Sequence, residues 1–165
     1  MMQLTKDNTA NKEREQMKIT ERENITNLPY SLHDMRVNAM ERKGDNLIMR
    51  FEGGYLKLGE ACEQVGGYIE FEKVDFDFCF VYVLDICANE GDFIGHKYLL
   101  ADFIKHKDCG SLADSTIYNA PFEIVGETYG YNTSVFEGYL YVGEGIRECV
   151  IDVYHFGAMR YVAEK

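Results

Sequence analysis

Four carboxylates in one segment could support catalysis or binding. Glu70, Glu72, Asp75 and Asp77 lie within residues 68–84, where polar and apolar residues alternate as they do in a β-strand. Residues two apart on a strand are about 6.6 Å apart, which is within the carboxyl separation of inverting glycosidases. That spacing is wide for a calcium cage of about six to eight oxygens. Such an acidic row is also the ordinary solvent-facing side of a half-buried sheet, and it could dock a basic partner.

The other side of this segment is apolar, with a change of parity in the middle. Ile69 and Phe71 share one face, and the apolar residues that follow share one face with the opposite parity, namely Val74, Phe76, Phe78 and Phe80. Side chains on a strand alternate with period two, so the slip at Glu72 and Lys73 predicts a bulge or a tight turn. With a bulge, all four carboxylates would lie on one face, opposite the aromatic row.

Two tyrosines, Tyr139 and Tyr141, could form a binding surface later in the chain. In residues 135–142 the apolar side chains share one face, and the two tyrosines share the other with Glu137. Tyrosine beside acidic residues suits a protein interface, because it buries a large area at low entropic cost and keeps a polar tip. The pair could equally line a sugar or small-ligand groove, or lie on a strand buried on both sides.

His33 and Asp34 are adjacent, and a histidine with a carboxylate can act as a base and its orienting group. Neighbouring strand residues point to opposite faces, which argues against that pairing. Asp34 is therefore expected to bond local backbone at a strand entry, with His33 as an ordinary polar residue.

Cysteine and histidine spacing allows one partial metal site. His106 and Cys109 form a single close pair that His96 or Cys87 could complete. Structural zinc sites normally combine two close pairs, so the sequence predicts no metal site.

Nothing in the sequence identifies a catalytic residue. Cys149 and His155 would share one face of a strand, but six residues separate them, or about 20 Å, too far for a nucleophile and its base. The phosphate-loop, dinucleotide-binding, nucleophile-elbow and zinc-protease motifs do not occur. We expect no cofactor, and whether the protein is an enzyme stays open.

The elements that would position these residues are short strands between turns. Strands are expected at residues 37–42, 47–52, 55–58, 68–84, 96–100, 122–125, 135–142, 149–156 and 159–163. Residues 59–66 read as a loop or one helical turn, and residues 100–106 as the one short internal helix. About nine or ten short strands without alternating long helices predict a mainly β fold, an antiparallel β-sandwich or a partly open barrel.

The chain divides into two parts of different character. Residues 1–27 are polar and are expected to form an arm that is disordered or a frayed helix. Residues 28–165 are expected to form a single β domain. The arm carries five basic and five acidic residues, so the whole net charge of −11 belongs to the domain. This charge argues against nucleic acid and anionic membranes as partners and would attract a basic protein.

The sequence predicts a cytoplasmic location. The longest apolar run, residues 78–84, is far shorter than the roughly 20 residues of a membrane span, and no signal-peptide pattern opens the chain. The five cysteines are odd in number and contain no C-x-x-C, so they are expected to be reduced.

The start of the domain carries a resemblance. Leu32-His33-Asp34 precedes a strand, a Gly/Asn hairpin and residues 47–54, and this order is similar to the opening of many small uncharacterised bacterial β domains. Some of those domains look like immunity proteins of bacterial toxin systems. The resemblance implies a β fold and a binding role, and no catalytic residue comes with it.

The sequence thus favours a non-catalytic, acidic interaction module that binds a basic protein, such as an immunity-type inhibitor of a basic toxin. The expected partner-binding residues are Glu70, Glu72, Asp75, Asp77, Tyr139 and Tyr141. A carbohydrate-binding or small-ligand-binding β domain is the first alternative, and a carboxylate-based hydrolase the second. The oligomeric state and the identity of the partner stay open.

Overall fold

The computed structural model describes residues 17–23, 27–85, 95–109 and 120–164, with the side chains of residues 106–109 excepted. Within these residues the chain is mainly β. The strands are β1 (Met17–Glu21), β2 (Tyr30–Ser31), β3 (Arg36–Lys43), β4 (Asn46–Phe51), β5 (Tyr55–Lys57), β6 (Glu63–Val65), β7 (Gly67–Phe71), β8 (Phe80–Leu84), β9 (Gly95–Leu99), β10 (Phe122–Gly130), β11 (Thr133–Val142), β12 (Gly145–Tyr154) and β13 (Met159–Glu164). The helices are the 3-10 helix η1 (Phe76–Phe78) and the α-helix α2 (Leu100–Cys109).

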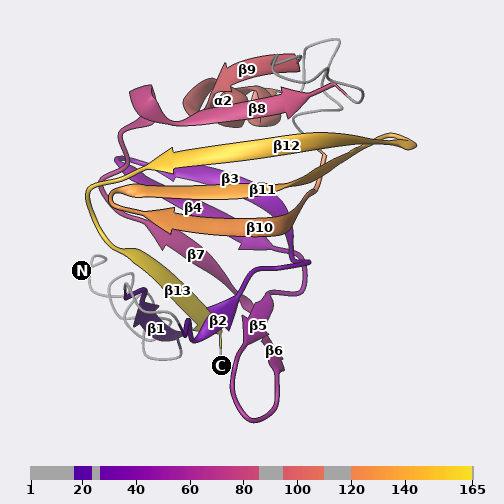
Figure 1. Ribbon diagram of the computed structural model, residues 1–165. Helices are drawn as coiled ribbons and strands as arrows, with labels where there is room; N and C mark the ends of the chain where they lie inside the picture. The colour runs from indigo at the N-terminus through magenta and orange to yellow at the C-terminus, as the bar shows by residue number, and fades with distance from the viewer. Residues whose placement is uncertain (1–16, 24–26, 86–94, 110–119, 165) are drawn as a thin grey trace, which may run out of the picture.

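Ten strands form one antiparallel sheet in the order β1-β13-β7-β4-β3-β10-β11-β12-β8-β9. β3 and β10 share only two register pairs, Val37 with Phe122 and Arg36 with Glu123. The sheet bends at this short pairing, so that β10, β11 and β12 lie across β3, β4 and β7 (Figure 1). The two halves face each other as in a sandwich, and apolar side chains fill the space between them.

The two halves are joined again where residues 72–75 meet residues 154–157. Three backbone hydrogen bonds of 3.0 Å cross this junction, and Val74 and His155 form an antiparallel bridge. β12 continues through the junction into β13, which pairs with β7, so one stretch of chain belongs to both halves. The result is a β-sandwich that is partly closed toward a barrel.

The interior is rich in aromatic side chains. Phe71 of β7 packs edge-to-face against Phe136 of β11, with ring centroids 6.0 Å apart. Helix α2 lies beside β8 and β9 and buries Leu100, Phe103 and Ile104, the spacing of an amphipathic helix. No helix in the described part of the chain is both long and apolar enough to cross a membrane.

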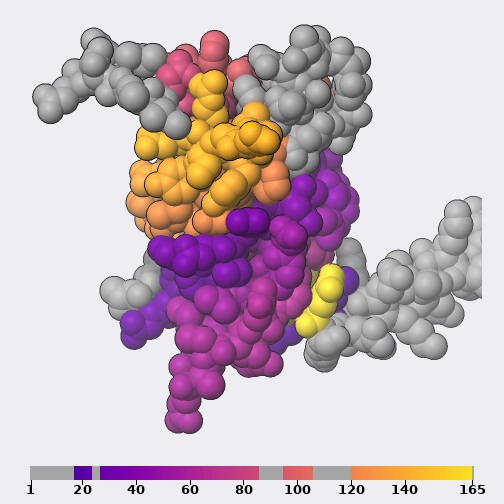
Figure 2. All heavy atoms as spheres, turned by 90° about the vertical axis from the view of Figure 1, so that its right-hand side faces the viewer, coloured from indigo at the N-terminus to yellow at the C-terminus, as the bar shows by residue number. Residues whose placement is uncertain are grey.

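Strands β2, β5 and β6 form a second, small sheet, and the β5–β6 hairpin projects from the body of the molecule (Figure 2). The base of this hairpin is anchored by Tyr55, whose ring packs against Tyr30 and Tyr161 with centroids 5.2 and 5.8 Å away. Residues 57–64 beyond this anchor are exposed.

A β-bulge in β10 changes what the interior contains. The register shifts between Ile124 and Gly126, so Ile124 points inward before the bulge and Glu127 and Tyr129 point inward after it. The Glu127 carboxylate accepts a hydrogen bond from the Tyr129 hydroxyl at 2.6 Å and one from the backbone N–H of Leu32 at 3.1 Å. One part of the interior is therefore polar and internally hydrogen-bonded.

The mainly β, antiparallel fold predicted from the sequence is confirmed, and so is the short internal helix, which extends to Cys109. Strands outnumber the nine or ten expected, partly because very short ones carry no sequence signal. Residues 63–65, expected in a loop or helical turn, form β6 because they pair with β5 in the projecting hairpin.

The prediction of a disordered or frayed-helical arm is wrong for residues 17–21. These residues form β1, which pairs along its whole length with β13, from Met17 opposite Glu164 to Glu21 opposite Arg160. β1 is an edge strand with largely exposed side chains, so the backbone bonds to β13 hold it and no apolar pattern reveals it. Residues 1–16 and 24–26 lie outside the described residues.

Within residues 68–84 the tight turn expected at Glu72 and Lys73 is confirmed, whereas the expectation that the strand resumes directly after it is wrong. β7 ends at Phe71, Lys73 adopts a positive φ of 52°, and η1 follows before β8 begins. The Asp75 carboxylate caps η1 by accepting a hydrogen bond from the backbone N–H of Asp77 at 3.3 Å. The parity slip in the sequence therefore marks a turn and a helix, and the four carboxylates do not share a strand face.

Gly138 occupies a tight position between β10 and β11, where a Cβ atom would lie 1.8 Å from the carbonyl oxygen of Glu123. Gly138→Ala is expected to push the two strands apart and to lower the free energy of unfolding by about 3 kcal/mol, the upper end of overpacking penalties. Gly145→Ala is the matched control, because its Cβ would lie 3.5 Å from the nearest atom, an ordinary contact. Urea unfolding measures both variants, and equal stabilities would contradict the close approach.

Candidate functional site

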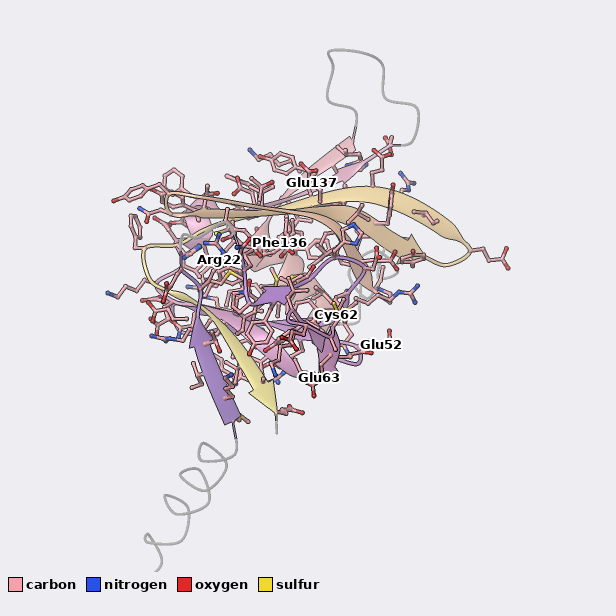
Figure 3. All side chains as sticks on the ribbon, turned by 60° about the horizontal axis from the view of Figure 1, so that its bottom comes forward. Arg22, Glu52, Cys62, Glu63, Phe136 and Glu137 are labelled. Carbon is pink, nitrogen blue, oxygen red and sulfur yellow. The ribbon has the colours of Figure 1, made fainter. Side chains whose placement is uncertain are left out.

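The outer face of β11, β12 and β8 is the side of the sheet turned away from the core. Along β11, Ser134, Phe136 and Leu140 are buried, while Glu137 and Tyr139 between them are exposed. Figure 3 shows Phe136 on the inner side of the strand and Glu137 on the outer side. Two concave regions with exposed aromatic or apolar residues occur among the described residues on and beside this face.

The first region is an aromatic patch, which we define as Phe78, Tyr154 and Phe156. The Tyr154 ring centroid lies 6.2 Å from that of Phe78 and 5.2 Å from that of Phe156. Phe78 is 61% exposed and Phe156 59% exposed, which is unusual for phenylalanine. The patch is therefore an apolar surface of adjacent rings, a feature more typical of binding sites than of isolated surface residues.

The backbone explains why these rings face solvent. Within the single turn of η1, Phe76 is buried and Phe78 is turned outward. The Asp75 cap sets the start of this turn, and Leu100 N donates to the Cys79 carbonyl at its end, 2.9 Å away. Phe156 follows the junction at His155, where its backbone N–H donates to the Lys73 carbonyl at 3.0 Å.

A cavity of about 360 Å³ adjoins the patch and includes Phe156 in its lining. Its charged lining residues are Arg42, Asp45, Lys73, Asp75 and Asp77. The Arg42 guanidinium is held by two contacts: it lies 4.1 Å from the centroid of the Phe76 ring, and it donates a hydrogen bond to the Gly44 carbonyl. The rim beside the aromatic patch thus carries three carboxylates and two cations.

The structure divides the four carboxylates of the sequence prediction into two pairs. Asp75 and Asp77 line the cavity beside the aromatic patch. Glu72 instead pairs with Arg160, and this hydrogen bond is the main reason why the pKa of Arg160 is raised. Glu70 accepts a hydrogen bond from the Asn46 side chain at 2.9 Å. Glu70 and Glu72 are therefore engaged within the fold.

The two predicted tyrosines also separate. The Tyr141 hydroxyl donates to Glu123 at 3.1 Å, and its ring lies 4.7 Å under the Arg36 guanidinium, which bonds the same carboxylate at 3.0 Å. Hydrogen bonding to Glu123 also raises the pKa of Arg36. Tyr141 is thus held inside a surface cluster, whereas Tyr139 is 36% exposed and lines the second concave region.

That second region is an open groove of about 430 Å³ across β10, β11, β12 and the end of β8. Its floor includes Gly126, which carries no side chain, and the backbone of Gly138, and its apolar lining includes Val125 and Val150. Glu137, Tyr139 and Glu148 supply the polar groups, and among the described residues no lysine or arginine lines the groove. We call these residues the glycine-floored groove.

Ser134 and His155 form a buried hydrogen-bonded pair beside a cavity of about 180 Å³. The Gly157 carbonyl, 2.9 Å from His155 Nδ1, can only accept, so Nδ1 carries the proton and Nε2 accepts from the Ser134 hydroxyl at 3.1 Å. This resembles a nucleophile and its base, but Ser134 is only 2% exposed. The pair instead joins β11 to the residues between β12 and β13.

The remaining sequence candidates are not brought together. Cys149 and His155 stay apart, since Cys149 pairs with Val83 and Gly138 in the middle of the sheet, and burial raises the pKa of its thiol to about 12.

His33 does contact Asp34, with Nδ1 and Oδ1 3.0 Å apart, but both side chains are largely exposed. No group of three or more potential metal ligands occurs among the described residues. Cys87 and the side chains of His106 and Cys109 lie outside them.

Sequence reasoning missed Phe78 and Phe156 as site residues, because Phe78 belonged to the apolar row of an expected strand and Phe156 was the last residue of another. One signal was available: Asp75-x-Asp77 just after the parity slip is a helix-capping pattern, and a helical turn there displaces Phe78 from the buried row.

Comparison with known protein families, curated proteins and solved structures finds no match for this chain.

The buried His155 makes a specific pH dependence testable. Burial, and secondarily Arg22, lower its pKa from 6.5, although the Gly157 carbonyl opposes this shift. The unfolded chain then binds a proton more readily than the folded one, so stability should fall as the pH drops below about 6.5, by at most about 1.4 kcal/mol per pH unit from this residue. His155→Gln should remove that contribution. Urea unfolding at several pH values between about 7.5 and 5.5 compares the two slopes, and identical slopes would contradict the assignment.

Proposed function

We propose that this protein is a binding module for a basic protein partner and that the aromatic patch is the centre of its binding surface. The observation that carries the proposal is the exposure of Phe78 and Phe156 around Tyr154, next to Asp75 and Asp77. Aromatic anchors surrounded by polar groups are the usual energetic centres of protein interfaces.

Charge supports a basic partner over other classes. The net charge of −11 lies on residues 28–165, and Asp45, Asp75 and Asp77 line the cavity beside the patch. Complementary charge accelerates association and disfavours acidic competitors, while the buried rings supply most of the affinity. An immunity-type inhibitor that covers a basic toxin is the narrower form of this proposal.

A carboxylate-based hydrolase finds less support. Such an enzyme needs two carboxyls converging in a cleft, one of them with a raised pKa. The carboxylates of the sequence prediction are divided between a capped turn and internal partners, as described above.

The test is affinity capture from a lysate of the source organism with the immobilised protein, eluted across a salt gradient. Phe78→Ser with Phe156→Ser should abolish retention of the partner, and Asp75→Asn with Asp77→Asn should shift elution to lower salt. The asparagine at position 75 can still cap η1, so the fold should persist.

Leu58→Ser and Glu60→Gln are the matched controls, because both residues are exposed on the distant β5–β6 hairpin. A protein that the wild type and controls retain equally, that the patch variants lose, and that has a high isoelectric point supports the proposal. Equal retention by the patch variants contradicts it. So does a wild-type dimer in sedimentation that becomes a monomer in the Phe78/Phe156 variant, since the patch would then hold a second copy of the chain.

A further inference from the structure

We propose that the glycine-floored groove is a binding site for an arginine side chain of a protein ligand. This inference rests on the proposed function and deepens it, since it assigns a second position on the same domain to a basic group of the partner.

The shape of the groove follows in part from Gly126. Gly126 lies opposite Glu137 across the β10–β11 ladder and places no side chain on the outer face of the sheet. Gly138 belongs to the inward-facing row of β11, between Phe136 and Leu140, and lines the groove only with its backbone. An added Cβ at Gly126 would lie 3.3 Å from a carboxylate oxygen of Glu137, so that carboxylate occupies the space over the glycine.

The two carboxylates of the groove are available to a ligand. Within the described part of the chain, neither Glu137 nor Glu148 makes a hydrogen bond or an ion pair, whereas Glu41, Glu72 and Glu123 are each paired with an arginine. Both available carboxylates are exposed, so a ligand can reach them.

The positions of Tyr139, Glu137 and Glu148 along their strands indicate which kind of ligand fits the groove. Tyr139 is directly opposite Glu148, and Glu137 is two residues earlier on the same face of β11, which makes Glu137 and Glu148 diagonal neighbours with about 7–8 Å between them. A planar guanidinium fits such a frame, because it can stack on a tyrosine ring and donate in several directions within its plane. Lysine offers a point charge and stacks less well.

The apolar part of the lining suits the rest of an arginine side chain. Val125, Leu84 and Val150 line the groove beside the carboxylates, and Val125 is itself exposed. The methylene stem of arginine buries against such surfaces while its head group stays at the polar rim. A neutral sugar would satisfy the tyrosine, but it would leave two full charges unpaired.

The experiment is a titration of the ¹⁵N-labelled protein with the tripeptide N-acetyl-Gly-Arg-Gly-amide at low salt, followed by backbone amide shifts. The matched probe is the same peptide with citrulline, which has nearly the shape of arginine but no charge. We expect saturable shifts confined to the groove residues with the arginine peptide and none with the citrulline peptide. Glu137→Gln with Glu148→Gln should weaken binding about tenfold, since two exposed ion pairs are lost.

Shifts of equal size with citrulline, scattered shifts that include Glu60 on the remote hairpin, or an unchanged affinity of the double glutamine variant would each overturn the assignment. The glutamine substitutions preserve shape and lie on an exposed face, so a change in folding is not expected, and the amide spectrum of the variant verifies this. The capture experiment is judged by the Phe78/Phe156 and Asp75/Asp77 variants, which leave both glutamates unchanged. If capture succeeds and the titration fails, only the groove assignment is wrong, and the reverse result refutes the aromatic patch alone.

Discussion

The structure depends on the junction at which residues 72–75 pair with residues 154–157. This short run of backbone hydrogen bonds joins the two halves of a bent sheet on one side. On the other side, β3 and β10 share two register pairs, and Asp34 and Met35 bond the backbone of Ile124. The junction also orders the surface above it, because the chain must leave the junction through η1 on one side and through Phe156 on the other. The backbone hydrogen bonds that join the two halves of the sheet therefore also place the rings of the aromatic patch at the surface.

The β-bulge in β10 divides the interior into two environments. Before the bulge the inward side chains are apolar, and after it Glu127 and Tyr129 point inward and must be paired. Their pairing with each other and with Leu32 N ties the first residues of the domain to β10. Burial and the neighbouring tyrosine and glutamate raise the pKa of Tyr129, which keeps its hydroxyl protonated as the donor in this network.

The surface charges are used in two different ways. Glu72, Glu123 and Glu41 pair with arginines of neighbouring strands and hold the sheet surface in one arrangement. Asp77, Glu137 and Glu148 make no ion pair within the described residues, and they adjoin exposed aromatic rings. Carboxylates that are available to a ligand thus occur at both proposed binding regions.

Period-two alternation, turn residues and the scarcity of helical patterns were enough to determine a mainly β domain, its main hairpins and its short helix, because these are local properties of a half-buried strand. Local pattern could not reveal β1, whose pairing with β13 comes from backbone bonds between residues far apart in sequence. It also could not decide whether Glu70, Glu72, Asp75 and Asp77 act together, because that depends on a positive φ at Lys73 and on the position of Arg160 in a distant strand. Whether a segment forms a strand is encoded within a few residues. Whether its side chains are exposed, and which side chains they pair with, depends on which distant segments the closed sheet brings side by side.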